Sequence, residues 1–280
     1  MGGLTLKGRG LLSGKVYVAV AALLWGTIGI ATKMALAAGA GPAAIGAFRA
    51  LISAGLALIV LRERVLDRKL MALGLLFTGP LFLTYMFSVT FSGMGIAAVL
   101  LYTAPAFVII FAAIFLKEKI TERKLAALAL ASAGAVLTQL HSLDQQNLAG
   151  IAFGLGSSLA YSGIILMARK LMTSGYTALE VGLGPQPWSA LELLPFIFLD
   201  TYRLNFDFLV AVTYLGVFTS FLAYYLHAKG VGEIEASLAG IISNVEPASA
   251  VMFGLLLGEK LETEGVVGSL LVILGAMLAG

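Results

Sequence analysis

The chain has 280 residues, of which 60% are hydrophobic and 12% charged, and its formal net charge is +3. So much apolar sequence exceeds what a soluble core needs and indicates an all-α membrane protein. The absence of cysteine excludes disulfides and thiolate metal sites. His141 and His227 lie in different halves, and the basic residues lie in short turns between apolar runs. We therefore expect no metal, no cofactor and no nucleic-acid partner.

Ten apolar segments are long enough to cross a hydrocarbon core about 30 Å thick. Lys7, Arg9 and Lys15 precede the first segment without a cleavage-site pattern, so we interpret this stretch as a retained cytosolic N-terminus. In chain order, the expected spans are 16–37, 42–61, 70–91, 95–116, 121–140, 148–168, 177–199, 206–228, 234–257 and 263–280.

The distribution of Lys and Arg predicts the orientation of these spans. Of the 18 basic residues, 14 lie at the N-terminus or in the turns after spans two, four, six and eight. Only Arg203 and Lys260 lie on the other side, and Lys33 and Arg49 lie inside spans. Because cytosolic loops carry the excess of basic residues, we expect both termini to be cytosolic in a multi-pass protein of the inner (plasma) membrane.

Two stretches of the chain resemble each other at a spacing of about 141 residues: Gly93–Leu137 and Gly230–Leu278. Each has a proline within an apolar run, Pro105 or Pro247, followed by a short charged turn and a second apolar run. We therefore predict two repeats, 1–141 and 142–280. With five spans each, the second repeat must enter the membrane in the inverted orientation. Inverted repeats are typical of secondary transporters that work by alternating access.

Four short motifs stand out along the chain: Leu24-Trp25-Gly26 with Lys33, Phe48-Arg49-Ala50, Pro105 with Leu116-Lys117-Glu118-Lys119, and Asn244-Val245-Glu246-Pro247 with Leu257-Gly258-Glu259-Lys260. These motifs resemble those of the EamA-type transporters in the drug/metabolite transporter superfamily. The resemblance covers nearly the whole chain and implies a ten-helix carrier for small metabolites, often an exporter of amino acids or related compounds. Tyr161 stands where Trp25 does in the first repeat, and Arg169 stands where Lys33 does.

The two prolines in equivalent positions, Pro105 and Pro247, are candidate hinges. Proline lacks an N–H, so the carbonyls of Leu101 and Ser243 lose their helical partners and need another inside the membrane. The partner is a neighbouring helix, water or substrate, and the alternative to a hinge is a simple packing kink.

Charged residues inside the spans are candidates for substrate or proton binding. Glu246 is expected near the middle of the membrane, where it either binds a substrate amine or a proton or fixes helix ends as a structural partner. Arg49 lies about two turns inside span two, on the outer side, where it meets a substrate carboxylate, pairs with a helix C-terminus or snorkels outward to the membrane surface.

Span seven cannot form a regular helix because it contains Gly182, Gly184, Pro185 and Pro187. Broken spans are tolerated next to protein or a water-filled cavity. We expect its polar members to line the transport path, with a packing irregularity as the alternative. Those members include Glu180, Gln186, Trp188 and Glu192.

Aromatic and polar side chains near the two prolines are the expected substrate-binding residues. Tyrosine combines an apolar body with a polar tip, which suits a neutral or zwitterionic organic solute, although single aromatic residues in spans more often serve packing. The predicted binding residues are Trp25, Tyr85, Tyr102, Tyr161, Ser243 and Asn244.

Spans five and ten have few polar groups and carry small residues at helical spacing, including Ala127, Ala131 and Gly268. Such faces allow close helix packing at the periphery or in a homodimer.

These observations predict a secondary transporter, not an enzyme, that moves a small-molecule substrate across the lipid bilayer. Amino acids, aromatic ones among them, are the favoured cargo and export the favoured direction. That choice rests mainly on the resemblance. The alternatives are a multidrug pump, a flippase for a lipid-linked sugar and, further removed, a membrane enzyme, which would need clustered acid, base or metal-binding residues.

Overall fold

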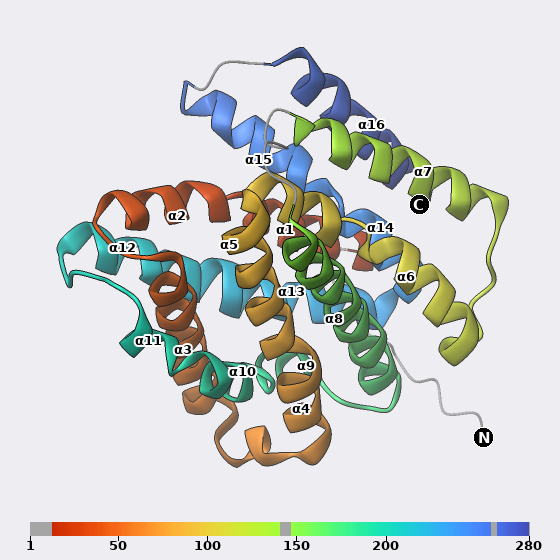
Figure 1. The fold of residues 1–280 in the computed structure, drawn as a ribbon. Helices are drawn as coiled ribbons and strands as arrows, with labels where there is room; N and C mark the ends of the chain where they lie inside the picture. The colour runs from red at the N-terminus through yellow and green to blue at the C-terminus, as the bar shows by residue number, and fades with distance from the viewer. Residues whose placement is uncertain (1–12, 141–146, 259–261, 280) are drawn as a thin grey trace.

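Helices and turns make up the architecture. The computed structural model describes residues 13–140, 147–258 and 262–279, and within these ranges it contains no β-strand (Figure 1). The all-helical class expected from the sequence is thus confirmed for these residues. Of the described helical segments, six are long and apolar enough to cross a membrane: Gly14–Ala37, Pro42–Leu66, Arg68–Leu101, Leu148–Thr173, Phe206–Glu233 and Ala236–Leu256. Five residues of the sequence patterns above lie outside the described residues: Lys7, Arg9, His141, Glu259 and Lys260.

Within the described residues, the first half of the chain forms seven α-helices, joined in places by short 3-10 or π-helical segments. They are α1 (Gly14–Gly26), α2 (Ile28–Ala37), α3 (Pro42–Leu61), η1 (Arg62–Leu66), α4 (Arg68–Leu73), η2 (Gly74–Thr78), α5 (Gly79–Leu101), α6 (Ala104–Phe111), η3 (Ala112–Leu116) and α7 (Glu122–Leu137).

The second half forms the remaining helices. They are α8 (Leu148–Thr173), α9 (Ala178–Leu183), α10 (Gln186–Leu193), α11 (Phe196–Leu199), α12 (Phe206–Tyr214), η5 (Leu215–Leu222), α13 (Ala223–Glu233), α14 (Ala236–Ser243), α15 (Val245–Leu256) and α16 (Thr263–Ala279).

Three apolar segments are interrupted near their middle. The break between α1 and α2 falls at Thr27, that between α5 and α6 at Tyr102 and Thr103, and that between α14 and α15 at Asn244. The hydroxyls of Thr27 and Thr103 each donate to a carbonyl three residues earlier, at 2.6 Å. These bonds give partners to carbonyl groups near the breaks, and membrane helices tolerate a break only when such groups find partners.

Pro105 and Pro247 lie directly after two of these breaks, in the first turns of α6 and α15. Proline is tolerated there because the first amides of a helix have no intrahelical partner in any case. The sequence suggested a helix bent around each proline. Instead, one helix ends before the proline and another begins. The role of the two prolines as hinges remains a prediction.

Two π-helical segments, η2 and η5, occupy corresponding places in the two halves. They begin at Gly74 and Leu215, which is the same spacing of about 141 residues that separates the sequence copies. A π-helical turn inside an α-helix often marks a functional region, because it displaces the side chains that follow it.

In α5, Gly93 has φ 78°, a value that favours glycine, and the helix is kinked there between the third and fourth expected spans.

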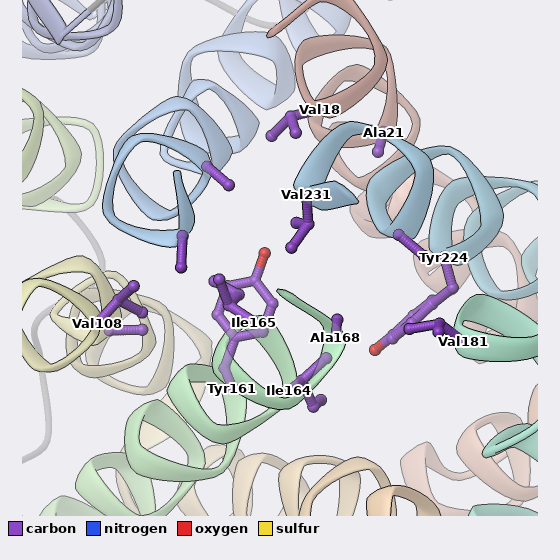
Figure 2. Close-up of a cluster of buried hydrophobic side chains, with 14 of the residues drawn as sticks. Val18, Ala21, Val108, Tyr161, Ile164, Ile165, Ala168, Val181, Tyr224 and Val231 are labelled. Atoms are coloured by element: carbon purple, nitrogen blue, oxygen red, sulfur yellow. The ribbon is translucent and has the colours of Figure 1, made fainter. Parts of the chain in front are cut away.

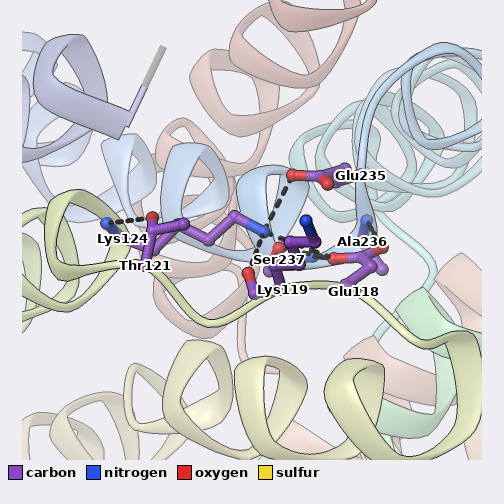
Figure 3. A network of polar contacts seen from close by, with 7 residues as sticks. All are labelled: Glu118, Lys119, Thr121, Lys124, Glu235, Ala236 and Ser237. Carbon is purple, nitrogen blue, oxygen red and sulfur yellow. Dashed lines mark hydrogen bonds and ion pairs between the residues drawn. The ribbon is translucent and has the colours of Figure 1, made fainter.

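The basic turns lie together at one end of the bundle, which we call the basic end. Arg64 lies 3.5 Å from Glu180 at the start of α9, and Arg169 in the last turns of α8 donates to the carbonyl of Gly232 at 2.7 Å. Lys124 at the start of α7 forms a 2.8 Å ion pair with Glu235, which directly precedes α14 (Figure 3).

Different helix termini meet at the opposite end of the bundle. The carboxylate of Asp200, after α11, accepts hydrogen bonds from the amides of Ala43 and Ala44 in the first turn of α3, at 2.8 and 3.0 Å. The side chain of Asn205 donates to the carbonyl of Ala38 at the end of α2, at 3.0 Å. Both contacts join the two halves of the chain.

Helices α7 and α16 pack directly against each other, as Figure 1 shows. A Cβ atom on Gly134 would lie 2.5 Å from the carbonyl oxygen of Gly268, and one on Gly275 would lie 2.7 Å from the amide nitrogen of Ala131. The small-residue faces of spans five and ten are therefore buried against each other within one chain. This is the use of small residues for close packing that membrane helices show. The homodimer expected through these spans remains a prediction. The small-residue faces do not support it, because they are already occupied by each other within one chain.

The main apolar core lies between α1, α6, α8 and α13 (Figure 2). Val18, Val108, Ile165 and Val231 are completely or almost completely inaccessible there. Gly14 and Gly230 bring α1 and α13 into backbone contact, because a Cβ on Gly230 would lie 2.6 Å from the carbonyl oxygen of Gly14. This packing closes the bundle at its basic end.

Candidate functional site

A cavity of about 110 Å³ lies where the broken helices meet. Backbone that leaves the helical conformation inside a membrane is tolerated where it borders such a cavity. Its wall combines aromatic and aliphatic side chains with one basic and one acidic residue from both halves of the chain. The lining residues are Trp25, Ile28, Arg49, Leu81, Phe82, Tyr85, Leu101, Tyr161, Tyr224 and Glu246.

Arg49 supplies the positive charge of the cavity from the first half of α3. Its Nε donates to the hydroxyl of Ser220 in η5 at 3.0 Å, and its guanidinium lies 5.2 Å from the centre of the Phe82 ring. These contacts hold the base of the guanidinium while the side chain remains only half-buried. The prediction that Arg49 meets the substrate is compatible with this position.

Glu246 supplies the negative charge from the first turn of α15. The N-terminus of a helix carries partial positive charge, which favours a carboxylate there. The Tyr102 hydroxyl approaches Glu246 Oε1 at 3.5 Å, a distance at the limit of a hydrogen bond. Glu246 thus lies at a helix end, as expected if it has a structural role. It also faces the cavity, as expected if it binds a substrate amine or a proton.

Trp25 lies at the centre of an aromatic cluster. Its indole N–H donates to the carbonyl of Thr219 at 2.9 Å, and its ring meets those of Tyr161 and Tyr224 edge-on, with centroids 6.0 and 5.5 Å apart. The Tyr161 hydroxyl is buried and has no hydrogen-bond partner among the described residues. Trp25 and Tyr161, which occupy equivalent places in the two sequence copies, therefore meet at the same wall.

Three of the predicted binding residues, Tyr102, Ser243 and Asn244, do not line the cavity. The Asn244 side chain donates to the carbonyl of Tyr102 at 3.4 Å, so it links the helix break after α14 to the break after α5. The Ser243 hydroxyl donates to the carbonyl of Ala239 at 2.9 Å and lies 3.4 Å from Nε2 of His227. In this structure both residues hold the broken helices together.

Span seven is broken, as predicted, but its polar residues lie away from the cavity. Glu180 closes a capping box with Thr177 at the start of α9 and pairs with Arg64 at the basic end. The indole N–H of Trp188 donates to the carbonyl of Val65 at 2.7 Å, and Gln186 is completely buried. In this structure the break in span seven is a packing irregularity, and its polar residues do not line the cavity.

Glu192 is also separate from the cavity. A Cβ on Gly79 would collide with its carboxylate, so Glu192 lies directly against the start of α5. Its Oε2 is buried and has no hydrogen-bond partner among the residues that the structure describes. The structure thus brings together Trp25, Tyr85, Tyr161, Arg49 and Glu246, and leaves Glu180 and Glu192 elsewhere.

Five cavity residues were not among the predicted binding residues: Ile28, Leu81, Phe82, Leu101 and Tyr224. Four of them are ordinary apolar residues in apolar spans, so neither composition nor spacing distinguishes them from lipid-facing neighbours. Tyr224 carried the one usable signal, because it has the same amphipathic side chain as the predicted tyrosines.

Broken apolar helices around a mainly apolar cavity that holds one basic and one acidic side chain are typical of helical membrane transporters. The chain belongs to the EamA-like transporter family, whose model matches residues 12–140 and again residues 148–280. This agrees with the sequence resemblance and with the two copies within the chain.

Several similar proteins are also described as transporters. An uncharacterized transporter of Archaeoglobus fulgidus is 28% identical over 93% of this chain and 96% of its own, and the uncharacterized transporter YwfM of Bacillus subtilis is 31% identical over 94% and 92%. A probable terminal-alkyne amino-acid exporter of Streptantibioticus cattleyicolor is 27% identical over 66% of this chain and 63% of its own. A crystal structure with 18% identity has a TM-score of 0.82 and covers 95% of this chain and 96% of its own, which shows a common fold.

Proposed function

We propose that this protein is a ten-span carrier that moves amino acids across the membrane by alternating access. The observation that carries the proposal is the cavity at the helix breaks, which combines an aromatic wall with one positive and one negative side chain. Aromatic and aliphatic walls accept an apolar side chain, and a few polar groups orient the solute. Metabolites with other charge patterns, including multidrug cations and lipid-linked sugars, have less in common with this lining.

The distribution of contacts favours one of the two states of such a carrier. Toward the basic end, the core around Val18 and Val231 and the ion pair of Lys124 and Glu235 close the bundle. Arg49 and Tyr85, in the part of the cavity nearer the other end, are only half-buried. We infer a state that is closed at the basic end, and export is the direction that the family relationship favours. With the basic end in the cytosol, this is an outward-facing state in the inner membrane, with both termini cytosolic.

A liposome assay tests the proposed function. We expect the purified protein to support counterflow of radiolabelled L-phenylalanine or L-leucine. Trp25→Ala and Tyr161→Ala should each weaken the apparent affinity several-fold, because an aromatic contact or hydrogen bond contributes about 1 kcal/mol. Phe198→Ala is the matched control, since Phe198 is 82% exposed on α11, away from the cavity. Absence of counterflow with every amino acid tested would contradict the proposal.

The ten-span topology has its own test in cysteine labelling. The natural chain has no cysteine, so single cysteines at Ser13, Arg64, Arg203 and Thr263 report on four exposed positions. In inside-out and right-side-out vesicles, we expect a membrane-impermeant thiol reagent to reach the first two only from the cytosolic side. The last two should react only from outside. Labelling of Ser13→Cys and Thr263→Cys from the same side would contradict the predicted arrangement.

A further inference from the structure

Opposite charges share the cavity without forming an ion pair. The structure describes both Arg49 and Glu246, and no nitrogen of the one lies within 4.0 Å of a carboxylate oxygen of the other. Buried or half-buried charges inside a membrane are costly unless they are paired or wet, so opposite charges in one cavity are expected to approach each other. Their separation leaves room between them for a third partner.

Each charged group is held from one side only. Arg49 uses Nε for the bond to Ser220, and its two terminal nitrogens have no hydrogen-bond partner among the described residues. Those nitrogens form the planar fork that binds a carboxylate through two parallel hydrogen bonds. Among the described residues, Glu246 has only the long contact from the Tyr102 hydroxyl, and it retains capacity to accept from an ammonium group.

We propose that Arg49 and Glu246 bind the two charged groups of a zwitterionic α-amino acid, with Arg49 on the carboxylate and Glu246 on the ammonium. The inference rests on the proposed function and specifies how its site selects substrates. The solute completes the missing ion pairs, so the loaded cavity has no unpaired charge. The remaining lining, which includes Leu81, Tyr85 and Leu101, then surrounds an apolar side chain.

This arrangement requires both charges of the solute at once. An amine without the carboxylate leaves Arg49 unpaired, and an acid without the ammonium leaves Glu246 unpaired. A site built to bind a polar group rejects an analogue that lacks it, because its own buried group is left without a partner. We therefore expect selection on the charged groups to be strong and selection on the size of the apolar side chain to be weaker.

The test is competition in the counterflow assay with L-phenylalanine as the labelled solute. Phenethylamine lacks the carboxylate, 3-phenylpropionate lacks the ammonium, and L-phenylalaninamide has a neutral amide in place of the carboxylate. In the natural protein we expect each of the three to compete on the order of 100-fold more weakly than unlabelled L-phenylalanine.

Two variants assign the charges to their partners. Arg49→Gln should weaken competition by L-phenylalanine while leaving that by phenethylamine nearly unchanged, so that the ratio between them falls at least tenfold. Glu246→Gln should have the same effect on the ratio of L-phenylalanine to 3-phenylpropionate. Glu192→Gln and Lys33→Gln are the matched controls, since they remove a charge from a helix without touching the cavity. Arg49→Lys keeps the charge but loses the fork, and should bind L-phenylalanine at intermediate strength.

The outcomes separate the two proposals. Counterflow of L-phenylalanine with equal competition by its amide and by phenethylamine would overturn the assignment of Arg49 and leave amino-acid transport intact. Equal competition by 3-phenylpropionate would do the same for Glu246. Failure of every amino acid to exchange would overturn the proposed function and this inference with it. If a variant inserts into the membrane but does not transport, its binding of L-phenylalanine is measured in detergent by calorimetry. This measurement applies to Arg49→Lys and Glu246→Gln and tests the assignment without turnover.

Discussion

Replacing Glu118 with alanine is expected to open the basic end of the bundle. Glu118 follows η3 in the first half, and its carboxylate accepts from the amides of Ala236 and Ser237 at 2.7 and 3.0 Å and from the Ser237 hydroxyl (Figure 3). It therefore caps the start of α14 in the second half. Lys124 lies 3.9 Å from the same carboxylate and joins it to Glu235.

This cap exists only while the two halves of the chain are in contact. Hydrogen bonds from backbone amides to a charged acceptor contribute about 2 kcal/mol together when partly buried. Loss of that contribution should shift the equilibrium between the closed and open basic end roughly 30-fold toward the open state, since 1.4 kcal/mol corresponds to a factor of ten. Ion pairs at the rim, such as that of Arg64 and Glu180, contribute less because water screens them.

Thiol accessibility measures this shift. Val108→Cys is the reporter, because Val108 is completely buried and packs on Gly240 of α14. We expect it to react slowly with a membrane-impermeant reagent in the natural background and at least tenfold faster with Glu118→Ala. Glu122→Ala is the control, since Glu122 is exposed four residues further along. An unchanged rate in the Glu118→Ala background would show that this contact does not hold the basic end closed.

The largest effect on stability is expected from Gly134→Ala. The added Cβ would lie 2.5 Å from the carbonyl oxygen of Gly268 and 2.7 Å from the amide nitrogen of Val272. Both are backbone atoms of α16, which cannot yield as a flexible side chain would. The added methyl group therefore forces α7 and α16 apart. Overpacking of a close contact typically costs about 1–3 kcal/mol, and we expect Gly134→Ala to lose about that much free energy of unfolding.

Gly55→Ala provides the comparison, because a Cβ on Gly55 of α3 meets no atom within 4 Å. There the substitution should be neutral or stabilising by roughly 0.5–1 kcal/mol, because glycine inside a helix is less stable than alanine by about that amount. Unfolding in detergent, followed by circular dichroism or tryptophan fluorescence, should give a lower midpoint for Gly134→Ala than for Gly55→Ala. Equal midpoints would mean that the α7–α16 contact is looser than the structure shows.

The class of the protein and much of its local structure follow from the amino-acid sequence alone. Long apolar runs indicate membrane helices because their backbone must satisfy its own hydrogen bonds in lipid. The repeated pattern around Pro105 and Pro247 indicated two copies of one unit, and the family model matches both halves. The prolines and the Gly-Pro series of span seven also identified where helices are interrupted, because these residues act on the backbone next to them.

Which of the candidate residues share a site depends on how the helices pack in three dimensions. Arg49 and Glu246 come from different halves and meet at one cavity, whereas Glu180, equally polar and in a broken span, caps a helix at the basic end. The small residues of spans five and ten pack on each other within the chain. The reason is that apolar content and proline act over a few neighbouring residues and are legible along the sequence. The convergence of side chains depends instead on how helices far apart in the chain pack, which no local pattern encodes.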